Sequence, residues 1–426
     1  MNKPVVGFAG MTHLGINSAV ATAARGFSVL GYHDDPALIE RLKRHEMPVV
    51  EPDLDDYVAK NAERLSFSAD AADLARCDIV YIAADVPTDD DAKSDLAPIV
   101  ALIEKVAANL RPDAVMVVLC QVPPGFCRGL SAVPHDRLVY QVETLIFGRA
   151  VERAMFPERF IIGLADPDAG LPAKYEEVLT AFGCPLLPMR YESAELAKIS
   201  INFCLVASVT VANTLAEVSE AIGADWSEIA PALKLDKRIG PHSYLAPGLG
   251  ISGGNLERDL RTVLNIGEPK GTDVGVVKAW IANSRYRKDW PWRTLRDAVL
   301  AQNPDAEIAV LGLAYKENTH STKNSPSLVL LSHLKGKPVA VHDPVVPASV
   351  VPWAKGAETP LACAEGADVL VIATPWPEYR KLPVAGLAAA MRGRTIIDPY
   401  RILDGKAAAD AGFAWHTLGM PPLLPV

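Results

Sequence analysis

Residues 5–15 read VVGFAGMTHLG, a short apolar run that leads directly into a glycine-rich turn, and the helical pattern INSAVATAARG follows. A strand, a glycine turn and a helix in this order are typical of dinucleotide-binding units, because the helix N-terminus accepts a pyrophosphate. In the G-x-G-x-x-G fingerprint the first and third glycines stand at Gly10 and Gly15, and Thr12 takes the second place. We expect Thr12 either to push the phosphates outward or to bind them through its hydroxyl. The alternative is a glycine turn that only packs helix on strand.

The acid that binds the adenosine ribose is expected about 20 residues further on, at the end of the second strand. His33 and Asp34 occupy that place. His33 could donate a hydrogen bond to a ribose hydroxyl or, if protonated, tolerate a 2′-phosphate. The pattern therefore predicts a nicotinamide dinucleotide, with NAD favoured over NADP.

Apolar runs alternate with helical patterns along the first ~190 residues, which indicates a parallel sheet covered by helices on both faces. We expect strands within residues 5–10, 27–33, 77–84, 114–120 and 159–165. A second α/β pattern follows residue 307. Its strands are expected within residues 307–315, 337–344, 368–375 and 395–400.

The region between the two α/β patterns is expected to be helical. From Glu192 to about Ile222 no proline interrupts a pattern that predicts one helix of ~45 Å. This helix is apolar over much of its circumference, so we expect it to be buried between domains or subunits. More helix is expected to about Trp290, broken by a glycine loop, and residues 291–307 are expected to be a linker.

Composition limits the possible partners. The 426 residues carry a formal charge of −9, which argues against nucleic-acid binding but leaves room for a small anionic ligand. We expect neither a signal peptide nor a membrane span, because no uninterrupted apolar stretch reaches about 18 residues. Six cysteines without metal-type spacing favour reduced thiols, a cytoplasmic protein and no metal site.

Two segments, ESAELAKISIN (192–202) and PGLGISGGNLERD (247–259), resemble the UDP-glucose/GDP-mannose dehydrogenase family. The resemblance continues in order along nearly the whole chain. The other matching segments are VPTDDD…DL (86–96), VPPG (122–125), VETLIFGRAV…PERFIIG (142–163), DKRIGPHSYLAPG (236–248), LGLAYKENTHSTKNSPS (311–327) and VHDP (341–344).

The resemblance implies an α/β fold with two Rossmann-like, doubly wound domains, joined by a long central helix and a helical middle domain. The expected parts are an NAD-binding domain (1–190), a central helical dimerisation domain (191–298) and a nucleotide-sugar-binding domain (299–426). Family members oxidise the C6 alcohol of a nucleotide sugar to a carboxylate with two NAD. A base and water assist the first hydride transfer. A cysteine thiolate then adds to the aldehyde, and the resulting thioester is hydrolysed.

The resemblance also implies catalytic roles. Lys198 and Asn202, one turn apart on a helix, would stabilise oxyanion character at the reacting carbon. Glu143 would handle a proton or orient water, and Asp259 would order the attacking water. Gln121 stands where the family's threonine holds a catalytic water. The plainer alternatives are a surface pair of Lys198 with Glu195, a pairing of Asp259 with Arg258 or Arg261, and, for Cys120, a small buried residue rather than a nucleophile.

Substrate contacts are implied as well. Arg238 matches an arginine that reaches the sugar nucleotide across the dimer, unless it is an ordinary solvated charge, and Lys316 matches a lysine that holds the substrate. Lys323 replaces an arginine and so lacks a bidentate fork. Ile146 and Phe147 replace an Arg-Glu pair, which suggests a sugar or orientation different from glucose.

The expected cofactor-binding residues are Gly10, Thr12, His13, Leu14, Gly15, His33, Asp34, Pro87, Thr88 and Gln121. The expected substrate-binding residues are Glu143, Leu145, Lys198, Asn202, Arg238, Tyr244, Gly250, Lys316 and Lys323.

The loop 247–259 departs from the family at its nucleophile. When its glycines and Asp259 are aligned, Asn255 falls on the catalytic cysteine, and a shift by one residue puts Leu256 there instead. An asparagine amide can only form hydrogen bonds, for example to a substrate hydroxyl or an oxyanion. We therefore expect a single two-electron oxidation of a nucleotide sugar, from alcohol to carbonyl, without a thioester. The alternatives are a four-electron 6-dehydrogenase that needs no cysteine and a catalytically inactive homologue that still binds sugar nucleotides.

Overall fold

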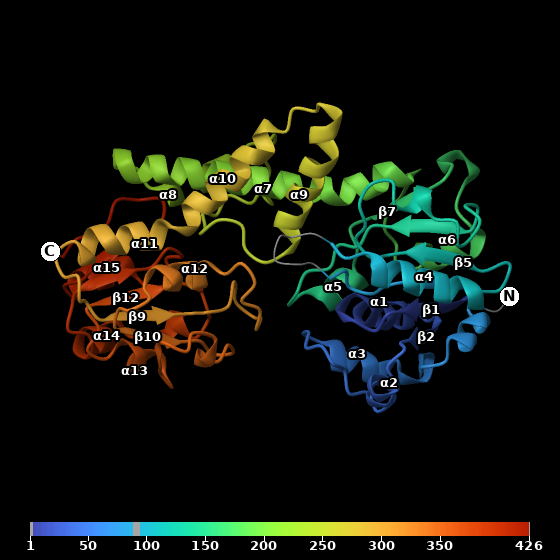
Figure 1. Cartoon of the computed structure of the whole chain (residues 1–426), viewed down its shortest axis with the longest axis horizontal. Helices are drawn as coiled ribbons and strands as arrows, with labels where there is room; N and C mark the ends of the chain where they lie inside the picture. The colour runs from blue at the N-terminus through green and yellow to red at the C-terminus, as the bar shows by residue number, and fades with distance from the viewer. Residues whose placement is uncertain (1–2, 88–93, 426) are drawn as a thin grey trace. The chain divides into compact units, whose positions relative to one another are not determined.

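The computed structural model of the chain describes residues 3–87 and 94–425 (Figure 1). They form two compact units, Met1–Ile201 and Asn202–Val426. Each unit contains one β-sheet, as the sequence predicts.

The first unit is built on an eight-stranded sheet with the order β3-β2-β1-β4-β5-β6-β7-β8. The chain order reverses between the neighbours β1 and β4, and such a switch point is where open α/β sheets bind ligands. Neighbouring strands are parallel, but β6 and β7 pair antiparallel, so the prediction of a wholly parallel sheet is wrong there. The strands are β1 (Val5–Ala9), β2 (Ser28–Tyr32), β3 (Leu65–Ser68), β4 (Ile79–Ile82), β5 (Val115–Val118), β6 (Leu138–Gln141), β7 (Phe160–Leu164) and β8 (Leu186–Arg190).

Helices cover both faces of this sheet. Alternate residues of one strand enter different cores, as β4 shows: Ile79 and Tyr81 pack with α1, while Val80 and Ile82 pack with α4. This arrangement is the doubly wound packing predicted from the sequence. The helices are α1 (His13–Ala24), α2 (Pro36–Lys43), α3 (Leu54–Lys60), α4 (Ala97–Asn109), α5 (Ala150–Met155) and α6 (Ala173–Thr180).

The long helix α7 (Tyr191–Ile222) confirms the predicted central helix within one residue. Among the described helices, α7 alone is long and apolar enough to cross a membrane by length and composition. Length and composition alone do not make α7 a membrane span, so the absence of a span stays a prediction. Only 28% of the most apolar 18-residue window is buried, so much of its apolar surface is uncovered.

The second unit continues from α7 with helices and then a second sheet. Residues 290–300 are helical, so the expected linker over 291–307 is wrong for its first half. The helices are α8 (Trp226–Leu235), α9 (Asn255–Gly267), α10 (Gly275–Lys288), α11 (Trp290–Leu295), α12 (Pro326–His333), α13 (Pro360–Ala364), α14 (Val384–Ala390) and α15 (Gly405–Asp410).

The second sheet has six strands in the order β11-β10-β9-β12-β13-β14, all parallel. The four predicted strands are present, and the two edge strands were not predicted. The strands are β9 (Ile308–Leu311), β10 (Val339–His342), β11 (Lys355–Gly356), β12 (Val369–Ile372), β13 (Thr395–Ile397) and β14 (Ala414–His416).

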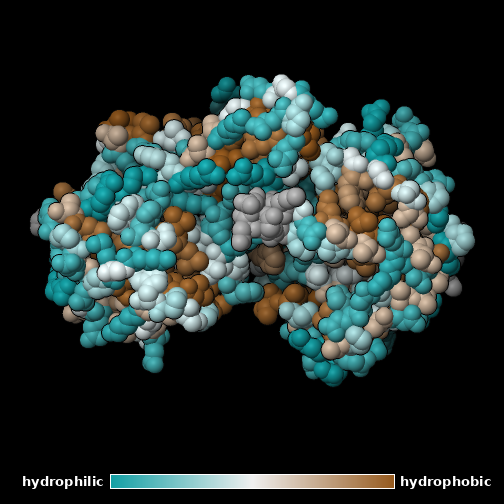
Figure 2. All heavy atoms as spheres, in the orientation of Figure 1, coloured by the Kyte–Doolittle hydropathy of each residue, from teal (hydrophilic) through white to brown (hydrophobic). Residues whose placement is uncertain are grey.

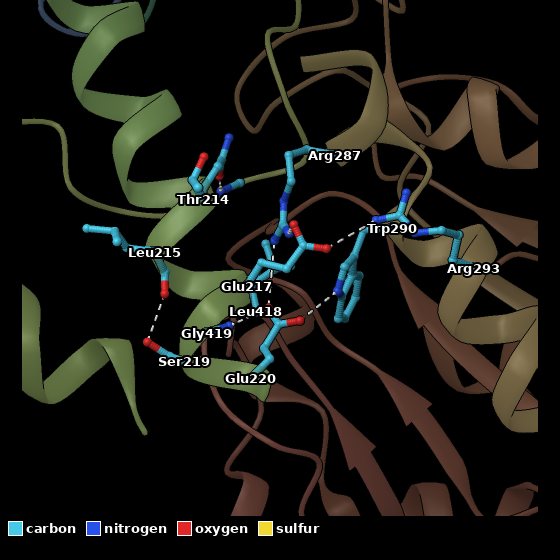
Figure 3. A network of polar contacts seen from close by, with 12 residues as sticks. Thr214, Leu215, Glu217, Ser219, Glu220, Arg287, Trp290, Arg293, Leu418 and Gly419 are labelled. Carbon is cyan, nitrogen blue, oxygen red and sulfur yellow. Dashed lines mark hydrogen bonds and ion pairs between the residues drawn. The ribbon is translucent and has the colours of Figure 1, made fainter. Parts of the chain in front are cut away.

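A buried arginine ties α7 to α10 within this unit (Figure 3). The side chain of Arg287 is completely buried, and its Nη1 lies 3.2 Å from a carboxylate oxygen of Glu217. Its Nη2 lies 3.7 Å from Glu220, which also accepts hydrogen bonds from Trp290 Nε1 (3.2 Å) and from the amide of Gly419 (2.8 Å). A buried guanidinium is tolerated only when it is paired in this way.

Replacing Arg287 with methionine removes the buried cation shared by the two carboxylates, of which Glu217 keeps a longer contact with Arg293 at 3.9 Å. The change should destabilise the second unit by about 3 kcal/mol. For a unit of this size, that change lowers Tm by roughly 6–12 °C. Thermal unfolding followed by circular dichroism measures it. The control is Arg285→Met, an exposed position on the same helix that should change Tm little. Equal shifts for the two variants would contradict the role of the buried pair.

Candidate functional site

The turn after β1 has room for backbone only. Gly10 has φ +100°, and a Cβ atom there would lie 2.7 Å from the backbone nitrogen of Ala84. A Cβ atom at Gly15 would lie 1.9 Å from the carbonyl oxygen of Gly10. The first turn of α1 carries no acidic residue and begins at the switch point of the sheet. This cradle fits the pyrophosphate of a dinucleotide.

The hydroxyl of Thr12 is hydrogen-bonded to backbone groups of the protein. Its Oγ1 accepts a hydrogen bond from the amide of Asp85 (3.0 Å) and lies 3.3 Å from the carbonyl of Ala83, to which it donates. Because these backbone groups already use the hydroxyl, the geometry favours the expectation that Thr12 pushes the phosphates outward over the expectation that its hydroxyl binds them. The side chain of Leu14 is buried in the core, so Leu14 can offer a cofactor only its backbone.

His13, the first residue of α1, is linked to a distant loop through Glu51. Its Nε2 lies 2.8 Å from Glu51 Oε1, and its ring stacks on Phe147 with 4.1 Å between centroids. The buried Glu51 carboxylate also accepts the amides of Gly148 (2.9 Å) and Ala150 (3.0 Å). Burial alone would raise the pKa of Glu51, but the hydrogen bonds from His13 and the two amides lower it overall. The bridge thus joins the glycine turn to the loop that follows Glu143.

The carboxylate that follows β2, that of Asp34, is hydrogen-bonded to other side chains. Asp34 accepts hydrogen bonds from the Tyr32 hydroxyl and from Lys105 Nζ, the latter at 2.6 Å. The bond from Lys105 is the largest cause of the lowered pKa of Asp34. His33 lies beside it, with its Nδ1 accepting a backbone amide. Pro87 is exposed, and Thr88 lies outside the described residues.

Lys198 pairs with Glu143 and not with Glu195. Lys198 Nζ lies 2.6 Å from Glu143 Oε1 and 2.9 Å from the Glu143 carbonyl, and both side chains are largely buried. Glu195 is fully buried and accepts the amides of Gly125 and Cys127, so the surface-pair alternative is wrong. The Glu143 carboxylate also accepts the amide of the expected substrate contact Leu145 at 2.8 Å.

The expected water-holding position Gln121 follows β5 and is partly buried. Cys120 before it is buried, and burial raises the pKa of its thiol to about 12. Cys120 is therefore a packing residue, as the plainer interpretation predicts. All six cysteines are free thiols, and Cys204 is exposed on α7.

Asn202 and Asp259 meet in the second unit. Asn202 Nδ2 donates to Asp259 Oδ2 at 2.5 Å, and Asp259 is 1% exposed. Arg258 Nε lies 3.6 Å from the other oxygen of this carboxylate. The pairing of Asp259 with Arg258 is the plainer alternative expected from the sequence, and its hydrogen bond to Asn202 was not predicted. Asn202 lies one turn after Lys198 on α7.

The glycine loop is fixed by backbone contacts. Gly250 has φ +77°, and a Cβ atom there would lie 2.3 Å from the carbonyl oxygen of Ser284 on α10. Ser284 Oγ accepts the amide of Ile251 at 2.7 Å. A Cβ atom at Gly253 would lie 3.1 Å from the Tyr315 ring. Asn255 is the first residue of α9, and its side chain is exposed.

The remaining expected substrate residues divide into two groups. Lys316 and Lys323 are partly buried, and the carbonyl of Lys323 accepts the amide of Gly253 at 3.2 Å, which places this segment against the glycine loop. Arg238 is 89% exposed and paired with Asp236 at 2.7 Å, and Tyr244 is half exposed. These two lie on the surface of the second unit, and for Arg238 this exposure fits both the expected substrate contact and the alternative of an ordinary solvated charge.

Three residues that organise these loops were not singled out from the sequence: Glu51, Ser284 and Asn324. Asn324, at φ +56°, donates to Glu257 Oε2 at 2.6 Å, close to the start of α9. The one available sequence signal is Glu51, an acid within the otherwise apolar and proline-bearing run MPVVEP (47–52). Within the described ranges, no group of three or more His, Cys, Asp or Glu residues could hold a metal ion.

Comparison with known proteins gives matches along the chain. Three models of the UDP-glucose/GDP-mannose dehydrogenase family match: the NAD binding domain over residues 5–182, the central domain over 192–285 and the UDP binding domain over 309–405. UDP-glucose 6-dehydrogenase of Pseudomonas aeruginosa is 30% identical over 97% of this chain and 96% of its own. The corresponding protein of Rhizobium meliloti is 30% identical over 97% and 98%. The structure of a UDP-glucose dehydrogenase from Pyrobaculum islandicum superposes with a TM-score of 0.85 and 28% identity, covering 97% of both chains.

Glu51→Gln should lower the stability of the first unit by about 2 kcal/mol at pH 7, because a charge-assisted acceptor of two amides and His13 is lost. The folded pKa of Glu51 is lowered, so its contribution is present above the unfolded value of about 4.3 and is lost as pH falls below it. Thermal unfolding between pH 3.5 and 7.5 should show the difference from wild type shrinking in acid. Glu63→Gln, an exposed change of equal charge, is the control. A difference independent of pH would contradict the assignment.

Proposed function

Because the chain belongs to the UDP-glucose/GDP-mannose dehydrogenase family, we propose that this NAD-dependent nucleotide-sugar dehydrogenase stops after one two-electron oxidation, from alcohol to carbonyl, without a thioester. One observation carries the proposal. Asn255 stands at the start of α9 where the family has its cysteine, and no cysteine occurs between Cys204 and Cys363. The covalent half of the family's reaction therefore lacks its nucleophile.

The Lys198–Glu143 pair suits the remaining half-reaction. The Glu143 carboxylate takes the proton of the sugar hydroxyl, and the Lys198 ammonium stabilises the developing alkoxide. Their separation of 2.6 Å places the proposed base and the proposed stabilising cation within reach of one substrate hydroxyl. A bound NAD would supply the hydride acceptor for the same carbon.

The buried Asp259 supports a second candidate, a four-electron route without cysteine. Asp259 is held by Asn202 and Arg258, and in this route its oriented carboxylate would order the attacking water. Water added to an aldehyde gives a hydrate, whose oxidation gives the acid directly. This route differs from the first in its product and in the number of hydrides transferred.

We further propose a cytoplasmic homodimer whose protomers meet along α7, with domains at residues 1–190, 191–298 and 299–426. Support comes from an apolar stripe on the second half of α7, where exposed residues recur every three or four positions and so share one face. Figure 2 shows hydrophobic surface where α7 and α8 come together, at the upper left. The stripe consists of Val211 (51% exposed), Leu215 (41%), Val218 (46%) and Ile222 (71%).

Purified enzyme should release one NADH per nucleotide sugar and form a carbonyl product that hydroxylamine traps. Asn255→Cys should restore a thiol at the loop and raise the yield to two NADH with an acid product. The control is Asn303→Cys, an exposed asparagine outside the loop. Mass spectrometry of the product and absorbance at the nicotinamide band measure both.

Two NADH and a uronic acid from the wild type would overturn the single-step proposal in favour of the cysteine-free four-electron route. An Asn255→Cys variant that forms no acid would overturn the alignment of Asn255 with the cysteine. No turnover with any nucleotide sugar, together with a raised Tm in their presence, would identify an inactive binding homologue.

Val218→Asp should convert the dimer to a monomer, because a carboxylate on each protomer would be buried without a partner at the interface. Sedimentation velocity should give about twice 45.7 kDa for the wild type and 45.7 kDa for the variant. Val50→Asp, which adds the same charge at a 98% exposed position of the first unit, should remain dimeric. A monomeric wild type would contradict the dimer.

A further inference from the structure

The residue at the end of β2 decides how a dinucleotide-binding domain recognises the adenosine ribose. An acid at this place accepts hydrogen bonds from the ribose hydroxyls and repels a 2′-phosphate, and sites that take the phosphate lack that repulsion. Here the place is held by His33, directly after β2 and beside the glycine turn after β1, to which β2 is joined by its parallel pairing with β1.

The imidazole of His33 has a fixed pattern of donor and acceptor. Its Nδ1 accepts the amide of Asp35 at 3.0 Å, so Nδ1 carries a lone pair and the hydrogen of the neutral ring is on Nε2. The ring is only partly buried, which leaves Nε2 as the group that can meet a ligand. His33 therefore presents a hydrogen-bond donor where an acceptor is usual.

The neighbouring carboxylates are engaged with protein groups. Asp34 is bound by the Tyr32 hydroxyl and by Lys105 at 2.6 Å. Asp35 caps α2 by accepting the amide of Ala37 at 2.9 Å. Asp70, in the loop after β3, accepts the amide of Ala72 at 3.0 Å. Each of the three acids thus has a local partner, and Lys105 adds a half-exposed cation on Asp34, the residue that follows His33.

We propose that this site recognises the adenosine 2′ position through donors, so that the enzyme accepts NADP as well as NAD. A 2′-hydroxyl can accept the Nε2–H of His33. A 2′-phosphate offers three acceptor oxygens to Nε2–H and to the Lys105 ammonium, whose pairing with Asp34 neutralises the adjacent acid. The inference rests on the dinucleotide-binding domain and not on the sugar reaction.

Binding of ADP-ribose and 2′-phospho-ADP-ribose to the full-length protein tests this directly by isothermal titration calorimetry. The wild type should bind the two with dissociation constants less than tenfold apart. His33→Asp should disfavour the 2′-phosphate ligand relative to ADP-ribose by at least a further tenfold. Lys105→Met, which frees the Asp34 carboxylate, should change the ratio in the same direction. The matched control is His45→Asp, an exposed histidine after α2.

A tenfold or greater preference of the wild type for ADP-ribose would overturn the proposal. So would an unchanged ratio in His33→Asp, an equal change in His45→Asp, or a lack of binding of either ligand. Failure of the nucleotide-sugar reaction leaves these measurements unaffected, because neither probe contains a sugar substrate or a nicotinamide.

Discussion

The contact between α1 and the turn after β1 is the constraint on which the first unit depends. The chain leaves β1 at Gly10 with a positive φ, and α1 returns so closely that Gly15 lies against the Gly10 carbonyl. Any side chain at either position would push helix and sheet apart. This close packing aims the N-terminus of α1 at the switch point between β1 and β4, and the NAD-binding role of the domain follows from it.

The glycine loop of the second unit is held in place by contacts that do not involve Asn255, the position that aligns with the family's cysteine. Gly250 packs on Ser284, Gly253 packs on Tyr315, and the carbonyl of Lys323 accepts the Gly253 amide. All of these contacts are made by backbone atoms or by residues outside the loop. The exposed side chain of Asn255 takes no part in them, so a change at this position alters the chemistry of the loop while its path is kept.

Much of the architecture could be predicted from the sequence, and the errors have local physical causes. Long apolar strands and the proline-free α7 are visible because their periodicity reports burial directly. The edge strand β8 was missed because most of its residues are exposed. The antiparallel pairing of β6 with β7 was missed because pairing direction depends on the path of the chain and not on the residues of either strand.

The candidate site was predictable one residue at a time, but its pairings were not. Lys198 and Asp259 were singled out, yet their partners Glu143 and Asn202 lie 55 and 57 residues away in the chain. Helix periodicity favoured Glu195, three residues from Lys198, as its partner. Tertiary packing instead buries Glu195 against the amides of Gly125 and Cys127.

The bridge through Glu51 has a consequence for the order of folding. It joins His13 to a residue 38 positions later and reaches Gly148 and Ala150, a further 97 and 99 positions along the chain. Contacts of such long range form only after the entropy of closing the intervening loops has been overcome. During synthesis the bridge cannot close before residue 150 has emerged from the ribosome. The nascent chain therefore carries its phosphate-binding turn for more than 130 residues before that turn acquires its final support.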